Sequence, residues 1–219
     1  IFFLNNFYVH EDFVKLCTGS GNKNYILAPI HPPQTEQEWG DWLKSLDNNT
    51  PNEVTFFLGH SYNSLNIKNI ISKNRLFITK EKYWYLPYKY FDYKNTKVTK
   101  YFNVDKLLYQ SMTVSIYALI WAIYMGYERI YLLGLDHDYF LYKDESEMRF
   151  YKDAIHQKNE FSRKFGDSFY IDEFLRQYQI FRQYDYINKH SNSSIINITP
   201  GGILEVFQRN KYEYLFKSI

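Results

Sequence analysis

The sequence has a single cysteine, Cys17, and no large excess of charge of either sign. One cysteine excludes an internal disulfide and fits a reducing compartment. The 26 Lys and Arg residues almost balance the 24 Asp and Glu residues, which leaves a net charge of +2. Because nucleic-acid-binding proteins usually carry a concentrated basic face, we expect no nucleic-acid partner.

Long hydrophobic runs are also missing. No run approaches the roughly 20 apolar residues that a membrane-spanning helix needs. The opening run, residues 1–4, is too short for the apolar core of a signal peptide and has no basic residues before it. We therefore expect a cytoplasmic protein, with peripheral association with the inner membrane and homo-oligomerisation left open. Because the chain begins with Ile1 and not Met, we interpret this run as a strand cut from a longer chain.

Several motifs of nucleotide and hydrolytic chemistry are absent from the sequence. It has no Walker lysine before Ser or Thr, and no G-x-G-x-x-G after a predicted strand. It has neither H-E-x-x-H nor G-x-S-x-G. The histidines other than His137 fall at no metal-ligand spacing: His10, His31, His60, His156 and His190. These absences disfavour a P-loop kinase, a standard dinucleotide fold, a zinc protease and an α/β-hydrolase, and we expect no resident metal or cofactor.

What the sequence does contain is an alternation of short apolar runs with longer helical segments. Its 219 residues have the length of one domain, and we place no boundary within 1–219. The predicted strands are 1–4, 25–28, 54–58, 76–78, 130–133 and 195–198, and the predicted helices are 36–46, 113–125 and about 170–189. This alternation favours an α/β domain with a Rossmann-like, mostly parallel sheet flanked by helices.

Two segments depart from the ordinary amphipathic pattern. The helix predicted at 113–125 is apolar nearly all round, which indicates complete burial, and Gly126 follows it as a C-terminal cap. Aromatic residues crowd among Lys and Asp in the segment 83–101. That segment is either a packed excursion over the sheet or an aromatic binding surface.

A polar segment follows the strand predicted at 130–133, and it holds the first candidate site. Ligands of open α/β sheets bind beyond the carboxyl ends of the strands. Gly134 would let the backbone approach a ligand, and Asp136, His137 and Asp138 would stand at the sheet edge. Alternatively, Asp136 caps a turn and His137 is an ordinary loop residue. Asp136 and Asp138 together could also hold a divalent cation.

A second polar turn follows the strand predicted at 195–198. It consists of Thr199, Pro200, Gly201 and Gly202, and we expect a short helix after it. Backbone amides at such a turn can bind phosphate or carboxylate. The alternative is an ordinary turn between a strand and a helix.

These residues resemble a known family. The stretch SIYALIWAIYMGYERIYLLGLD, residues 115–136, is similar to a stretch of bacterial sialyltransferases, which transfer a sugar from CMP-sialic acid to cell-surface glycans. It also resembles the related motility accessory factor and hydroxymethylpterin-diphosphokinase-like group. Strands of that group end in Gly-x-Asp-His, like residues 134–137, and in an "NATPGG"-like turn, like residues 197–202.

The resemblance implies an inverting, metal-independent glycosyltransferase that uses a nucleotide sugar and a glycan acceptor. It implies that a base deprotonates the acceptor hydroxyl, and that tyrosines and backbone amides stabilise the leaving phosphate. Asn5 follows a strand similar to one of the family whose asparagine contacts the nucleotide. The expected binding residues are Asn5, Leu133, Gly134, Tyr142, Tyr151, Tyr170, Thr199, Pro200, Gly201 and Gly202.

Two departures from the family pattern limit what carries over. The family's first strand and its Gly-Asn-Gly-Pro-Ser-type loop would precede Ile1, so we expect part of the site upstream of this chain. The sialyltransferases also have a histidine base just before their last long helix, where residues 167–173 read DSFYIDE. The general base is therefore expected among Asp136, His137, His156, Asp172 and Glu173.

Two other functions stay open. One is a kinase that transfers diphosphate to a pterin-like alcohol, with Mg²⁺ held by Asp136 and Asp138. The other is a non-catalytic glycan-binding module that uses the segment 83–101, because sugars stack on exposed aromatic faces.

Overall fold

The structure is a computed structural model, and it describes residues 1–61, 65–105, 108–141 and 169–216. It has an α/β fold in which every recorded strand pair is parallel. The expected fold class is therefore confirmed. The strands form three separate sheets, of four, two and three strands.

The four-stranded sheet occupies the N-terminal part of the chain, with the order β1-β2-β3-β4. Its strands are β1 (Phe2–Leu4), β2 (Asn24–Leu27), β3 (Thr55–Gly59) and β4 (Lys82–Tyr85). β2 is buried at every position, and only Thr55 of β3 is partly exposed. Both central strands are nearly continuous apolar runs, as expected for parallel strands that are covered on both faces.

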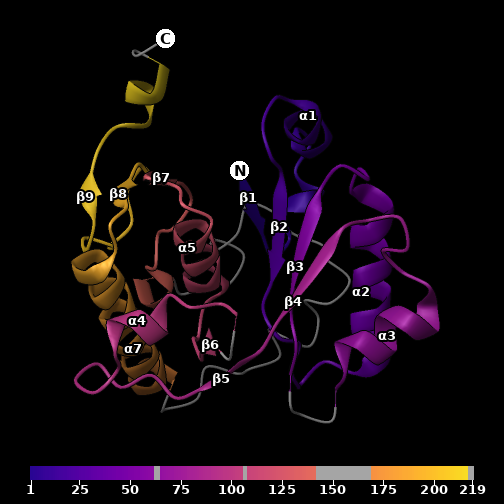
Figure 1. The fold of residues 1–219 in the computed structure, drawn as a ribbon, viewed down its shortest axis with the longest axis horizontal. Coiled ribbons are helices and arrows are strands. Elements are labelled where there is room, and N and C mark those ends of the chain that lie inside the picture. Colours follow the sequence, from indigo (N-terminus) through magenta and orange to yellow (C-terminus); the bar gives the residue numbers. More distant parts are fainter. Residues whose placement is uncertain (62–64, 106–107, 142–168, 217–219) are drawn as a thin grey trace.

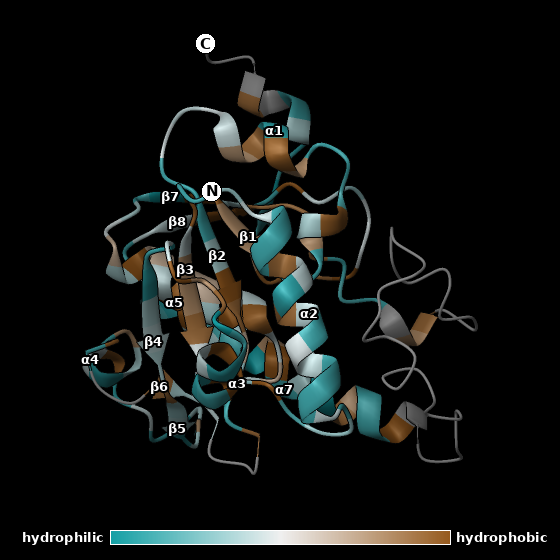
Figure 2. Cartoon of the chain, turned by 90° about the vertical axis from the view of Figure 1, so that its right-hand side faces the viewer, coloured by the Kyte–Doolittle hydropathy of each residue, from teal (hydrophilic) through white to brown (hydrophobic). Residues whose placement is uncertain are grey.

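Helices cover one face of this sheet, and the cluster of buried side chains between them includes Phe13, Leu43 and Phe56. Figure 2 shows hydrophilic residues on the outward side of α2 and hydrophobic residues along the strands behind it. α2 begins with a capping box between Thr35 and Glu38, which satisfies amide groups at its start. The elements on this face are η1 (Phe7–Val9), α1 (Phe13–Thr18), α2 (Glu36–Asn49) and α3 (Ile67–Asn74).

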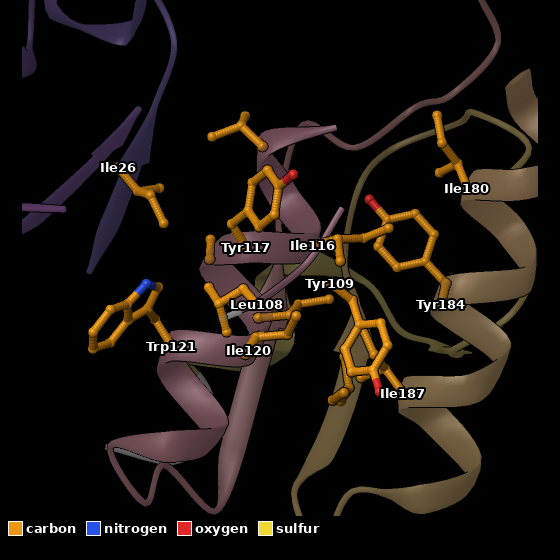
Figure 3. Packing of buried hydrophobic residues seen from close by; sticks show 14 of the residues in the cluster. Ile26, Leu108, Tyr109, Ile116, Tyr117, Ile120, Trp121, Ile180, Tyr184 and Ile187 are labelled. Carbon is orange, nitrogen blue, oxygen red and sulfur yellow. The ribbon is translucent and has the colours of Figure 1, made fainter. Parts of the chain in front are cut away.

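α5 (Val114–Tyr124) covers the other face and forms the centre of the molecule (Figures 1 and 3). Its side chains from Val114 to Ala122 are all buried. They pack against Ile26 of β2 on one side and Tyr184 of α7 on the other. The predicted fully buried helix is confirmed, and Gly126 follows it with a φ of 80°, as its predicted capping role requires.

The remaining elements lie beyond α5 (Figure 1). β5 (Pro87–Lys89) and β6 (Leu108–Tyr109) form the two-stranded sheet, with α4 (Val98–Tyr101) between them in the chain. The three-stranded sheet has the order β7-β8-β9. Its elements and neighbours are β7 (Arg129–Leu132), η2 (Tyr139–Leu141), α7 (Phe169–His190), β8 (Ser194–Asn197), β9 (Gln208–Arg209) and η4 (Tyr212–Phe216).

The strand predicted at 76–78 is wrong. Arg75 ends α3 in the left-handed conformation, and Phe77 has a φ of 53°. The amide of Phe77 donates to the Asp47 carboxylate at 2.9 Å, and its ring packs 4.7 Å from that of Phe56. Leu76 and Phe77 are therefore buried in a bend and not in a strand, Ile78 is exposed, and the next strand begins at Lys82.

The aromatic segment 83–101 combines the two environments that the sequence left open. Tyr85 and Tyr101 are buried in the core. Tyr83, Tyr88 and Tyr90 are 47%, 56% and 79% exposed.

None of the helices that the structure describes combines the length and the apolar character needed to cross a bilayer.

Candidate active site

The two polar turns predicted after β7 and β8 lie against each other. β7 and β8 are parallel neighbours, so their carboxyl ends meet at one edge of the sheet. The amide of Leu135 donates to Thr199 Oγ1 at 3.1 Å, and the amide of Ile203 donates to the Asp136 carbonyl at 2.8 Å. The 134–138 turn and the 199–202 turn therefore form one continuous structure.

Gly202 is the point of closest approach between the turns. Its φ is 72°, and a Cβ placed on it would lie 2.6 Å from Asp136 Cα and 2.7 Å from the Asp136 carbonyl oxygen. Only glycine fits this position without a shift of the backbone. Gly134 and Gly201 also have positive φ values, but a Cβ on either would meet no atom within 4 Å.

Asn197 and Thr199 hold the second turn from inside the protein. Both are buried. Asn197 Oδ1 accepts from the amide of Thr199 at 3.0 Å, and Asn197 Nδ2 donates to the Leu204 carbonyl at 2.9 Å. These two bonds, and the bond from the Ile203 amide to the Asp136 carbonyl, fix the segment that follows Gly202. The short helix expected there does not form, and the chain passes through a bend into β9.

Asp136 is partly buried at the junction of the turns. Burial is the main cause that raises the pKa of its carboxyl above the ordinary value, and the neighbouring Asp138 charge adds to the increase. The positive charge of Arg209 acts in the opposite direction. A carboxylate with a raised pKa is a stronger base than an ordinary aspartate.

His137 points away from this surface, into the core between α5 and α7. It is 6% exposed, and its backbone φ is 55°. Its Nε2 forms a 2.9 Å hydrogen bond with the Tyr184 hydroxyl, which also bonds to Ser115 Oγ at 2.6 Å. Figure 3 shows Tyr184 reaching from α7 toward α5. Burial, assisted by the Arg176 charge, lowers the pKa of His137 to about 4, so its imidazole is neutral at pH 7.

The two acidic candidates at the start of α7 differ in environment. Asp172 is exposed. Glu173 is buried, and its carboxylate accepts hydrogen bonds from Arg176 at 2.8 and 2.9 Å and from Gln177 at 2.7 Å. The Glu173 carboxylate is therefore paired with partners within α7 itself.

Asn5 lies at the end of β1, in the four-stranded sheet. Its side chain is exposed, its φ is 52°, and its carbonyl accepts a 2.6 Å hydrogen bond from the Tyr25 hydroxyl. The adjacent Asn6 is buried and accepts from Trp42 Nε1 at 2.6 Å.

The other predicted site residues divide into two groups. Leu133, Pro200 and Gly201 are exposed on the two turns. Tyr170 is in the first turn of α7, where the structure describes the backbone but not this side chain. Tyr142, Tyr151 and His156 lie outside the described residues.

Arg209 is a member of the site that sequence reasoning missed. β9 is parallel to β8, which brings Arg209 to the same sheet edge. Its Nη2 donates to the carbonyls of Thr199, at 2.7 Å, and of Gly201. Its Nη1 donates to Glu205 at 2.9 Å. β9 has only two residues, too few for a periodic signal.

A hollow among the described residues lies elsewhere. It has a volume of about 520 Å³ and is lined by residues at the ends of α4, α5 and α7, including Glu128 and Ser193. These two residues directly precede β7 and β8, so the hollow lies at the opposite end of the strands from the two turns. Its lining also holds the polar residues Asp105 and His190, but neither of the two turns contributes to it.

Within the four described ranges, no three His, Cys, Asp or Glu side chains come close enough to hold a metal ion together.

No protein-family model, curated protein sequence or solved structure matches the chain. The family resemblance of residues 115–136 and 197–202 therefore stays a prediction from those residues.

Proposed function

We propose that the chain is a glycosyltransferase that moves an acidic, sialic-acid-like sugar from a CMP-activated donor to a bacterial surface glycan. The observation that carries this proposal is the contact between the 134–138 and 199–202 turns, marked by the approach of Gly202 to Asp136. It joins two stretches that resemble the sialyltransferase-related families, at the sheet edge where α/β proteins bind ligands.

The backbone of these turns suits the binding of an anion. The amides of Gly134, Gly201 and Gly202 donate to no acceptor among the described residues. All three are glycines with positive φ values, so they carry no side chain of their own beside these amides. Free backbone amides in such turns bind phosphate oxygens. In the proposed reaction they stabilise the negative charge of the leaving CMP.

Asp136 is the proposed general base. The acceptor hydroxyl gives its proton to the Asp136 carboxylate as its oxygen bonds to the anomeric carbon of the sugar. The bond from that carbon to the phosphate oxygen breaks at the same time, and CMP leaves with the electron pair. The raised pKa of Asp136 favours this proton transfer. His137 serves as a positioning residue, because its buried ring holds the turn from behind.

A glycan-binding module is the second candidate function, and the exposure of Tyr88 and Tyr90 favours it. Sugars stack on exposed aromatic rings. This function predicts glycan binding without nucleotide binding.

A thermal-shift panel distinguishes these functions. It compares CMP, UDP, GDP, ATP and GTP, each with Mg²⁺ and with EDTA. A ligand at about 100 times its dissociation constant adds about 2.7 kcal/mol of stability, which such a measurement detects. A CMP shift that survives EDTA supports the glycosyltransferase. A purine-nucleotide shift that requires Mg²⁺ contradicts it in favour of diphosphate transfer, and the absence of any nucleotide shift contradicts both enzymes.

A further inference from the structure

The first half of α7 carries an apolar stripe on its outer side. The stripe residues recur at i, i+3, i+4 and i+7, which is the spacing of one helix face. Their side chains are 56–63% exposed, and they are Ile171, Phe174, Leu175 and Tyr178. The buried residues Glu173, Gln177 and Ile180 lie on the opposite side of the helix. The stripe therefore faces away from the core of its own chain.

The stripe ends where charged residues take over the outer side of α7. Arg182 donates to the Tyr178 hydroxyl at 3.2 Å, and its guanidinium stacks 3.6 Å from the ring centre of Tyr93. Asp185 and Lys189, which form a 2.8 Å ion pair, continue the same side of the helix. Only the first half of α7 is therefore suited to an apolar contact.

The size of the apolar surface decides what it can bind. Beside α7, Leu141 of η2 is 60% exposed, and the ring of its neighbour Phe140 lies 5.0 Å from that of Phe174. With more than half of each side chain exposed, the stripe and Leu141 leave roughly 500 Å² of apolar surface. Two such surfaces would bury about 1,000 Å² in total, which is near the lower limit for a specific interface. This area fits a reversible dimer with a dissociation constant in the micromolar range.

The stripe is symmetric about the point midway between Phe174 and Leu175. A two-fold axis through that point, perpendicular to the helix, generates an antiparallel copy of α7. It brings Ile171 level with Tyr178 of the partner subunit, and Phe174 level with Leu175 of the partner subunit. Every apolar position of the stripe then meets another apolar position. A two-fold interface requires this kind of self-complementarity.

The charges beside the stripe disfavour a membrane surface as its partner. Helices that lie on membranes carry Lys and Arg beside their apolar face. The only basic residue between positions 171 and 178 is Arg176, and it bonds to Glu173 within α7. Asp172 is exposed. In the two-fold arrangement Asp172 lies level with Gln177 of the partner subunit and not with a second carboxylate.

We propose that the chain forms a two-fold symmetric homodimer in which the first halves of two α7 helices pack antiparallel through this stripe. The second copy covers apolar side chains that the fold of one copy leaves in water. The inference does not rest on the proposed glycosyltransferase activity, because the stripe shares no residue with the 134–138 and 199–202 turns.

Sedimentation equilibrium of the full chain, over micromolar to submillimolar concentrations, tests the dimer. We expect the wild type to change from monomer to dimer as its concentration increases. Leu175→Glu should weaken dimerisation at least about 10-fold, because it places a charge at the centre of the contact. Ile78→Glu is the matched control and should dimerise like the wild type, because Ile78 is 71% exposed outside the stripe. Leu175→Glu should keep the urea stability of the monomer, since Leu175 is exposed in one copy.

Disulfide cross-linking tests the antiparallel arrangement. Ile171→Cys and Tyr178→Cys are oxidised separately and as a mixture, and Cys17 stays unchanged because it is buried. We expect cross-links in the mixture, between position 171 of one copy and position 178 of the other. Either variant alone should cross-link poorly, because like positions are about 10 Å apart along the helix axis, beyond the roughly 7 Å that a disulfide spans.

Three results would overturn the inference. They are a wild type that stays monomeric over the whole concentration range, a dimer that Leu175→Glu leaves as strong as before, and cross-linking of each single variant as efficient as in the mixture. None of these results bears on CMP binding, so the proposed function is tested separately.

Discussion

Gly202 lies directly on the backbone of Asp136, so closely that a single added methyl group would sit 2.6 Å from Asp136 Cα. This contact joins the turn after β8 to the turn after β7. It places a glycine of one turn against the backbone of Asp136 in the other. The exact shape of the site therefore depends on a residue that has no side chain.

Gly202→Ala tests this dependence. We expect the substitution to destabilise the protein by about 1–3 kcal/mol from backbone strain, with a further loss from the clash at Asp136, and to abolish CMP binding. Gly201→Ala is the matched control, because it has the same kind of strained φ but no neighbour within 4 Å. Urea denaturation measures both variants. Equal destabilisation of the two would contradict the importance of the contact.

Tyr184→Phe tests the hydrogen-bonded chain behind His137. The substitution leaves the buried Nε2 of His137 and Oγ of Ser115 without this partner, and we expect a loss of about 1–3 kcal/mol. Tyr101→Phe is the control, because Tyr101 is equally buried and its hydroxyl has no hydrogen-bond partner among the described residues. It should be neutral or stabilising. A result in which both variants lose the same stability in urea would oppose the assigned role.

The pKa of His137 predicts a dependence of stability on pH. Its folded-state pKa of about 4 lies below the ordinary value of 6.5, so between these pH values the unfolded chain binds a proton that the folded protein does not. The contribution of His137 therefore makes stability fall as pH decreases from about 6.5 to about 4, by roughly 3 kcal/mol in total. Urea titrations at pH 7 and pH 4.5 should show a smaller decrease for His137→Gln than for the wild type. Equal decreases in the free energy of unfolding of the wild type and His137→Gln would disprove the assignment of this pH dependence to His137.

Asp136→Asn tests the proposed base. We expect the variant to retain CMP binding, because the backbone amides are unchanged, and to lose about 10²- to 10⁴-fold in the rate of sugar transfer. Release of CMP from CMP-sialic acid in the presence of acceptor gives the rate. Asp172→Asn, at the exposed start of α7, is the control and should keep most of its activity. A transfer rate in Asp136→Asn close to that of the wild type would exclude Asp136 as the base.

The fold follows from the sequence where hydrophobic periodicity is strong. Burial on both faces is the stable arrangement for the apolar runs of β2 and β3. Burial on all sides is the stable arrangement for the helix from Val114 to Tyr124. Phe77 shows the limit of this reasoning. Its apolar neighbourhood resembles a strand, but a hydrogen bond to the distant Asp47 carboxylate and packing on Phe56 fix a bend. Tertiary contacts of this kind leave no local signal.

The candidate site was also predictable only where the sequence carries a local pattern. The strand-then-glycine pattern located both turns, and the parallel pairing of β7 and β8 brings them together. The sequence could not show which way a side chain faces, so His137 and Asp136 looked equivalent although one is in the core and the other at the junction of the turns. Arg209 was missed because its position depends on a two-residue strand and on carbonyls eight and ten residues away.

Hydrogen exchange with and without CMP, in EDTA, measures the central claim most directly. The account predicts slower exchange at the amides of Gly134, Gly201 and Gly202, which have no acceptor among the described residues, and little change along β1–β4. The same experiment with cytidine should give weaker protection at Gly201 and Gly202. Exchange that stays unchanged in both turns under saturating CMP, or protection confined to other segments, would contradict the placement of the nucleotide at this edge.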